Sequence, residues 1–336
     1  MTLAALALQF LLCAALIARA GFVLSRSADR LADMHGWGRG WVGLALLATV
    51  TSLPELASGI SAVAWVDAPN LAAGNALGAC VVNLAFLVVV DTLQRDQPMY
   101  RQASTTHLLS AGFGVVMLGF VALGLVLGER APAVVHVGLT SPLLLGLYLL
   151  ALRGVHAHEQ QARTAAVEAL QVAPTARASL QREWQRFGLA AAVVIIAGSW
   201  LPEAADALAQ ALGLSRSFVG TVLMAVVTTL PEMAVTLAAL RLGALDMALG
   251  NLLGSNLFNV LVLAVDDLFY AKGPLLAHVA PVHAGTAITA MVMSGLVIVG
   301  LVMRPQGRVL RVASWVSIGL VAAYLINASL AYLSRS

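Results

Sequence analysis

Residues 51–57 read TSLPELA, and residues 228–234 read TTLPEMA, a near copy placed 177 positions later. A second pair of stretches follows in the same order, with GNALG at residues 74–78 and GNLLG at residues 250–254. Two matched blocks in one order indicate an internal duplication. The chain is therefore expected to consist of two copies of one folding unit.

The composition places both copies in a membrane. The 336 residues are 60% hydrophobic and only 10% charged, with a mean hydropathy of +0.90, whereas soluble domains are about 45–50% apolar and about 25% charged. The net charge of +3 is too small and too dispersed for a nucleic-acid surface. Cys13 and Cys80 lie inside apolar runs, so neither a disulfide framework nor a cysteine metal site is expected.

Apolar stretches of transmembrane length, about 20 residues each, predict an all-α integral membrane protein of ten spanning helices. Their bounds are about 3–25, 38–64, 69–93, 104–127, 132–152, 187–212, 215–240, 246–268, 276–303 and 310–333. Most of the arginines fall in loops on one side, which is the cytoplasmic side by the positive-inside rule. Both termini are therefore expected outside.

The longest polar stretch, residues 153–186, is expected to be a cytoplasmic linker between two five-helix repeats at residues 1–152 and 187–336. The repeated motifs fall on the helices at about 38–64 and 69–93 in the first repeat, and at about 215–240 and 246–268 in the second. Because five is odd, the second copy must cross the membrane in the opposite direction. Inverted-topology repeats are typical of secondary transporters, which bind their substrates near the midplane on interrupted helices.

Glu55 and Glu232 fall near the middle of predicted spans, where a carboxylate facing lipid would cost about 2.5–3.5 kcal/mol. Both are expected to face the protein interior or a water path. Pro54 and Pro231 remove a backbone N–H and open the helix just before each carboxylate. Thr51 and Thr228 lie one turn earlier on the same helical faces and add hydroxyl oxygens.

The helix that follows the second motif carries polar side chains at a spacing of four, namely Asn251, Ser255 and Asn259. Asn83 matches Asn259 in the first repeat, but Ala79 stands where the serine would fall. Carboxylates, hydroxyls, amides and freed carbonyls without converging His or Cys suit a hard cation such as Ca²⁺ or Na⁺. The sequence therefore predicts a hard-cation site between the repeats.

These motifs resemble the α-repeats of the cation/Ca²⁺ exchanger superfamily, the sodium/calcium exchanger membrane region. The pattern of that family is roughly G-T-S-x-P-E followed by G-N-x-x-G-S-N-x-x-N or D. The resemblance implies that Glu55 and Glu232 are the central Ca²⁺ carboxylates, and that Thr51 and Thr228 serve both Ca²⁺ and flanking Na⁺. It also implies that the Na⁺ positions are lined by Ser52, Thr229, Ser255 and the carbonyls of Ala48 and Ala225. The ring of four side chains around the centre would be completed by Asn83 and Asn259.

The sequence departs from the family pattern at three places. Val50 and Val227 replace the Gly that often precedes the Thr, Ala79-Cys80 replaces Ser-Asn in the first repeat, and Asn259 stands where many members have Asp. The changes at positions 79 and 259 each remove an oxygen group. One flanking Na⁺ position is therefore in doubt.

The expected function is a secondary active antiporter that exchanges Ca²⁺ for Na⁺ by alternating access, with Ca²⁺/H⁺ exchange as the alternative. The residues after Gly74-Asn75-Ala76 are Leu77 and Gly78, whereas the related proton exchangers resemble one another in having a Glu there, which favours Na⁺. An intramembrane enzyme that uses Glu55 and Glu232 as an acid and base, and an ion sensor without transport, are remote alternatives.

We expect no enzyme activity and no resident cofactor. The expected partners are small inorganic cations and the lipid bilayer, with no nucleic acid and no obligate protein partner. The scarcity of Lys beside abundant Ala, Arg and Gly is typical of GC-rich bacterial genomes, and suggests a multi-pass protein of a bacterial cytoplasmic membrane.

Overall fold

The computed structural model describes residues 2–35, 48–94, 97–164, 177–305, 307, 309 and 313–333. Apart from one two-stranded antiparallel hairpin, the regular structure in these ranges is helical. The sequence-based prediction of an all-α protein is confirmed.

The elements of the first half follow one another from the N-terminus to the predicted linker. They are α1 (Leu3–His35), α3 (Ala48–Thr51), α4 (Leu53–Ala64), α5 (Pro69–Leu93), α6 (Met99–Gln102), α7 (Thr106–Leu127), η2 (Gly128–Arg130), β1 (Ala133–Val134), β2 (Val137–Gly138) and α8 (Thr140–Thr164).

The second half begins with a long helix and repeats the same succession. Its elements are α9 (Arg177–Leu212), α10 (Arg216–Phe218), the π-helical η3 (Val219–Met224), α11 (Ala225–Thr228), α12 (Leu230–Arg241), α13 (Leu245–Phe269), η4 (Leu275–Ala277), α14 (Val282–Met303) and α15 (Trp315–Leu333).

The duplication seen in the sequence is preserved in the helix bounds. The helices α4 and α12 start and end at an offset of 177 residues, and α3 and α11 end at the same offset. The pairs α5 and α13, and α7 and α14, match in length and are offset by 176 residues. The single-residue change of offset falls between α12 and α13, as the two sequence blocks predict.

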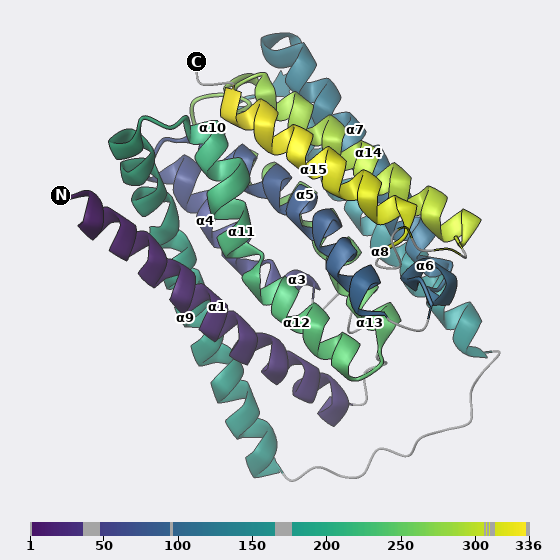
Figure 1. The fold of residues 1–336 in the computed structure, drawn as a ribbon. Helices are drawn as coiled ribbons and strands as arrows, with labels where there is room; N and C mark the ends of the chain where they lie inside the picture. The colour runs from purple at the N-terminus through teal and green to yellow at the C-terminus, as the bar shows by residue number, and fades with distance from the viewer. Residues whose placement is uncertain are drawn as a thin grey trace.

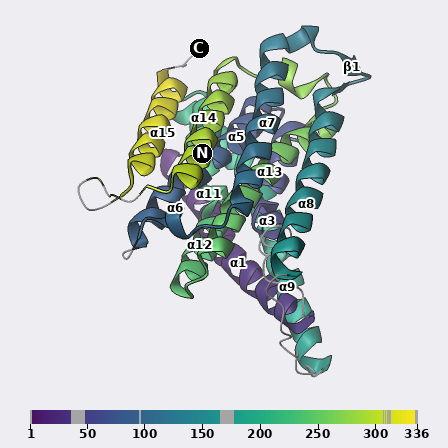
Figure 2. The same cartoon turned by 90° about the vertical axis from the view of Figure 1, so that its right-hand side faces the viewer.

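The motif helices lie in the centre of the molecule (Figure 1). The helices α1 and α9 pack against each other on one side of the motif helices, and α7, α8, α14 and α15 cover the other side. The turned view shows the hairpin at one end of the bundle and α6 toward the other (Figure 2). The motif residues are therefore surrounded by helices that shield them from the lipid.

Within the described ranges, seven helices are long and apolar enough to cross a membrane, and the pair formed by 216–228 and 230–241, bent by 41°, would make eight. The apolar part of α8 (140–155) and the helix α4 are shorter than that. Residues 38–47 of the second predicted span lie outside the described residues. The count of ten spans, the outside location of the termini and the inverted topology stay predictions.

Three helices continue beyond the predicted apolar spans. The apolar span of α1 is Leu3–Ala28, close to the predicted 3–25, and the helix continues to His35. The helix α8 continues to Thr164 and α9 already begins at Arg177, so the described parts of the predicted linker are helical. Residues 165–176 lie outside the described residues.

Candidate cation-binding site

Each motif glutamate lies in the first turn of a helix that begins inside the protein. The helical conformation is interrupted at Ser52 (φ −87°, ψ 12°) and at Thr229 (φ −81°, ψ 1°). Pro54 and Pro231 lie at the start of the helices that follow, α4 and α12. Proline is well tolerated there because the first N–H groups of a helix have no intrahelical acceptor. The positive end of each helix dipole therefore points toward the site, which favours the charged form of a carboxyl group.

Both glutamates are fully buried, and their carboxylates are poorly satisfied. Ser52 donates to Oε1 of Glu232 at 2.8 Å, but Oε2 of Glu232 and both oxygens of Glu55 have no hydrogen-bond partner among the described residues. Ser52 lies three residues before Glu55, so its contact with Glu232 brings the two like charges into one region of the interior. Buried polar atoms without partners are rare in folded proteins, and two such carboxylates demand a compensating positive charge.

The side chains of Asn83 and Asn259 show the same lack of partners. Both are fully buried, and neither amide makes a hydrogen bond within the described part of the chain. Asn259 lies one helical turn after Ser255, whose hydroxyl is 3.4 Å from that of Thr51. The amide oxygens of this pair are thus additional ligand atoms of the kind that Ca²⁺ and Na⁺ use.

Hydrogen bonds between the two repeats hold Thr51 and Thr228 in matching positions. The Thr228 hydroxyl donates to Oδ1 of Asn75 at 3.0 Å, and the Thr51 hydroxyl lies 3.5 Å from Oδ1 of Asn251. The Asn251 amide also donates to the carbonyl of Glu232 at 3.1 Å. Each asparagine therefore orients the threonine of the other repeat.

The two repeats meet in a reciprocal contact at positions 80 and 256, which match at the offset of 176. The thiol of Cys80 donates to the carbonyl of Asn256 at 3.6 Å, and the amide of Asn256 donates to the carbonyl of Cys80 at 3.3 Å. Such an exchange is what an approximate two-fold axis between the repeats would produce. Glu55 acts electrostatically on Cys80, so the contact lies near the carboxylates.

Glycines allow the helix α5 to approach the π-helix η3 closely. A Cβ added at Gly74 would lie 2.9 Å from the backbone nitrogen of Thr221, and one at Gly78 would lie 2.8 Å from the Cβ of Ala225. Real Cβ atoms do not make contacts this short, so the backbones can pack this tightly only because both positions are glycine.

Some of the predicted site residues contact one another, and others bond only to their own helix. Thr51, Ser52, Ser255 and Glu232 are linked by direct contacts, whereas the Thr229 hydroxyl donates to the carbonyl of Ala225 in its own helix at 2.8 Å. The carbonyl of Ala225 also accepts the Thr229 N–H, and that of Ala48 accepts the Ser52 N–H at 3.2 Å.

Asn251 belongs to the predicted polar stripe, but neither Asn75 nor Asn251 is among the predicted ligands. Each lies four residues before position 79 or Ser255, and this spacing is the sequence signal that marks them as candidate site residues. The structure shows each of them in contact with a motif threonine of the other repeat.

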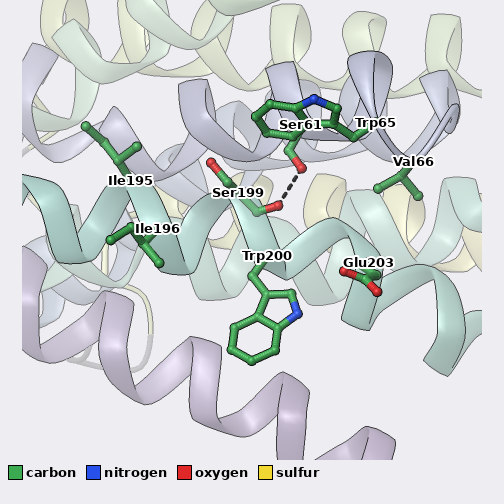
Figure 3. A pocket seen from close by; sticks show the side chains of 8 residues that line it. All are labelled: Ser61, Trp65, Val66, Ile195, Ile196, Ser199, Trp200 and Glu203. Atoms are coloured by element: carbon green, nitrogen blue, oxygen red, sulfur yellow. Dashed lines mark hydrogen bonds between the residues drawn. The ribbon is translucent and has the colours of Figure 1, made fainter.

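The surroundings of the site contain no alternative metal centre among the described residues, because no group of three or more His, Cys, Asp or Glu could hold a metal ion there. A separate groove of about 750 Å³ lies between α4 and α9 (Figure 3). Trp65, Ile195 and Trp200 line it, and a hydrogen bond from the Ser61 hydroxyl to the Ser199 carbonyl crosses it. Its walls are mostly apolar, and Glu203 is the one acidic residue among those that line it, so it does not suit a hard cation.

Comparison with known proteins gives a consistent result. The profile of the family described as sodium/calcium exchanger protein matches residues 5–155 and 183–333, once over each repeat. CaxA of Alkalimonas amylolytica is 28% identical over 236 residues, which cover 69% of this chain and 70% of CaxA. The sodium/calcium exchanger MaX1 of Methanosarcina acetivorans is 41% identical over 83 residues, 24% of each chain.

Solved structures of the sodium-calcium exchanger NCX_Mj have the same fold. One of them superimposes with a TM-score of 0.62 at 22% sequence identity, covering 98% of this chain and 99% of that one. The fold and the buried oxygen site define a helical membrane protein of the cation antiporter class rather than an enzyme. The chain belongs to the sodium/calcium exchanger family.

Proposed function

We propose that this protein exchanges Ca²⁺ for Na⁺ across a bacterial cytoplasmic membrane by alternating access. The observation that carries the proposal is the set of buried, unpartnered polar atoms on Glu55, Glu232, Asn83 and Asn259. Oxygen atoms of this kind, with the hydroxyls of Thr51 and Thr228 nearby, suit hard cations of variable coordination. The remaining members of the proposed ligand set are Ser52, Thr229, Ser255 and the carbonyls of Ala48 and Ala225.

Charge balance explains why the ions would exclude one another. The two glutamates carry a charge of −2 when both are ionised, and a dry site does not tolerate that charge unneutralised. One Ca²⁺ balances it, and so do two monovalent cations. Overlapping positions would keep Ca²⁺ and the monovalent ions from binding at the same time. The unneutralised charge would keep the empty transporter from crossing between its two states, and together the two effects couple the fluxes.

Flux through proteoliposomes tests the proposal directly. An outward Na⁺ gradient is expected to drive uptake of ⁴⁵Ca²⁺, and the Glu55→Gln, Glu232→Gln double variant is expected to abolish it. Glu203→Gln is the matched control, because Glu203 is an exposed carboxylate on α9 outside the site. Uptake driven only by an outward H⁺ gradient would make the protein a cation/proton antiporter, and Ca²⁺ binding without any flux would refute transport.

A further inference from the structure

A third acidic side chain, Asp266 on α13, is buried without a hydrogen-bond partner among the described residues. Asp266 is 0% exposed, and neither of its carboxylate oxygens makes a hydrogen bond within the described part of the chain. Its neighbour Asp267 is fully paired, accepting from Gly138, Ser141 and Leu275. The two adjacent carboxylates therefore have different roles, and hydrogen bonding explains only Asp267.

The position of Asp266 connects it to the cation site. Its carboxylate lies against Gly59 of α4, so closely that a Cβ at Gly59 would collide with it. Gly59 follows Glu55 by four residues, about 6 Å along the helix axis. On α13, Asp266 lies two turns beyond Asn259, on the face that carries Asn251, Ser255 and Asn259.

This feature is present in only one of the two repeats. The positions that match Gly59 and Asp266 are Thr236 and the fully buried Val90. The second repeat therefore has an ionisable group where the first packs a hydrocarbon, so packing alone does not require an acid here. The glycine at position 59 makes the room that the carboxylate occupies.

A buried carboxylate without a hydrogen bond must carry a counter-charge or be neutralised. None of the described ion pairs involves Asp266, and the charged group that acts on it, Asp267, has the same sign. The ionisable group of α4 is Glu55, one turn before Gly59, and it is also an acid. A single positive charge would neutralise Asp266, and the fully engaged Asp267 leaves no second carboxylate for a divalent ion.

We propose that Asp266 binds one monovalent cation, Na⁺ or H⁺, in addition to those at the glutamate pair. This inference rests on the proposed exchange of Ca²⁺ for monovalent cations. When Ca²⁺ occupies the glutamate pair, its double charge repels the cation at Asp266 and takes over part of the neutralisation. The exchange then moves three monovalent ions for each Ca²⁺ and transfers net charge, although Asn259 is neutral.

The first test compares the wild type with Asp266→Asn in proteoliposomes whose voltage is clamped with K⁺ and valinomycin. Wild-type Ca²⁺ uptake should depend on voltage, and uptake by the variant should continue but lose that dependence. A Na⁺ gradient at equal pH and a pH gradient at equal Na⁺ distinguish the two ions. Glu203→Gln should behave as wild type. Equal voltage dependence in the wild type and in Asp266→Asn would overturn the proposal.

The second test counts ions at equilibrium and needs no transport. Purified protein in detergent is saturated with ²²Na⁺, and the Na⁺ and the protons released on adding Ca²⁺ are counted together. Asp266→Asn should release one monovalent ion fewer per molecule than the wild type, and an unchanged count would overturn the proposal. A wild type that moves no Ca²⁺ would refute the proposed function, and this count would then decide the role of Asp266 by itself.

Discussion

Asp91 and Asp267 occupy matching positions near the ends of α5 and α13, and each holds the start of the last helix of the other repeat. Asp91 accepts from the N–H of Ser314 at 2.8 Å and from the hydroxyl of Ser317 at 2.7 Å, just before and within α15. Asp267 accepts from Gly138 and Ser141 at the start of α8. All of these positions repeat at an offset of 176. Each repeat is therefore hydrogen-bonded to the last helix of the other, at opposite ends of the molecule (Figure 2).

Neutralising either aspartate should lower stability. Each carboxylate accepts three hydrogen bonds, since Met99 also donates to Asp91 and Leu275 to Asp267. In Asp91→Asn or Asp267→Asn the new amide would face an N–H donor, and a buried donor without a partner costs about 1–3 kcal/mol. Thermal unfolding of the purified protein measures the loss. Glu129→Gln, on the exposed turn η2, should leave the melting temperature unchanged, and an unchanged melting temperature in the aspartate variants would contradict this role.

The hydroxyl of Ser52 should matter more for Ca²⁺ affinity than that of Thr229. Ser52 donates directly to the Glu232 carboxylate, whereas the Thr229 hydroxyl bonds to backbone carbonyls of its own helix. A hydrogen bond to a charged group contributes about 1.5–3 kcal/mol, so Ser52→Ala should raise the half-saturating Ca²⁺ concentration about tenfold or more. Thr229→Ala should change it less than about threefold. Titration of ⁴⁵Ca²⁺ uptake compares the two, and equal effects would contradict the observed asymmetry.

Ala79 marks the place where the first repeat lacks an oxygen ligand. The matching Ser255 lies 3.4 Å from the Thr51 hydroxyl, whereas Ala79 offers nothing to Thr228. Ser255→Ala should weaken the Na⁺ dependence of Ca²⁺ uptake by removing a ligand, and Ala79→Ser should strengthen it. Each change is expected to be about tenfold or less in the half-saturating Na⁺ concentration, the value of one modest hydrogen bond or ligand. A stronger Na⁺ dependence in Ser255→Ala, or a weaker one in Ala79→Ser, would show that the two positions are not equivalent.

The sequence predicts the interruption before each glutamate because Pro54 and Pro231 act through local geometry alone. The hydrogen bonds of Asp91 and Asp267 to distant serines are not predictable in the same way, because the neighbouring sequence does not indicate which helix each carboxylate will contact. The burial of His283, whose ring nitrogens have no partner among the described residues, is likewise not predictable from the residues around it. The matching His107 is 5% exposed and pairs with Asp246 at 3.0 Å.

The divergence of Ser52 from Thr229 shows a second limit of the sequence. Both residues have hydroxyl side chains at the same motif position, and the family resemblance implies the same role for both. In the structure one hydroxyl turns across the repeat interface and the other turns back to its own helix. Which rotamer a buried hydroxyl adopts depends on the packing around it, and that packing comes from helices far away in the sequence.

Close packing of α5 on η3 should be sensitive to a single methyl group. Gly78→Ala would place a Cβ against the backbone of Thr221 and the side chain of Ala225, and neither can move without shifting a helix. Overpacking of this kind costs about 1–3 kcal/mol, so the melting temperature and the yield of folded protein should fall. Gly112→Ala on α7 is the matched control, because a Cβ there meets no atom within 4 Å among the described residues. Helix propensity favours alanine at that control position by up to about 1 kcal/mol, so Gly112→Ala should be neutral or stabilising. If both variants lost stability equally, the close approach of α5 to η3 would not be what requires a glycine at position 78.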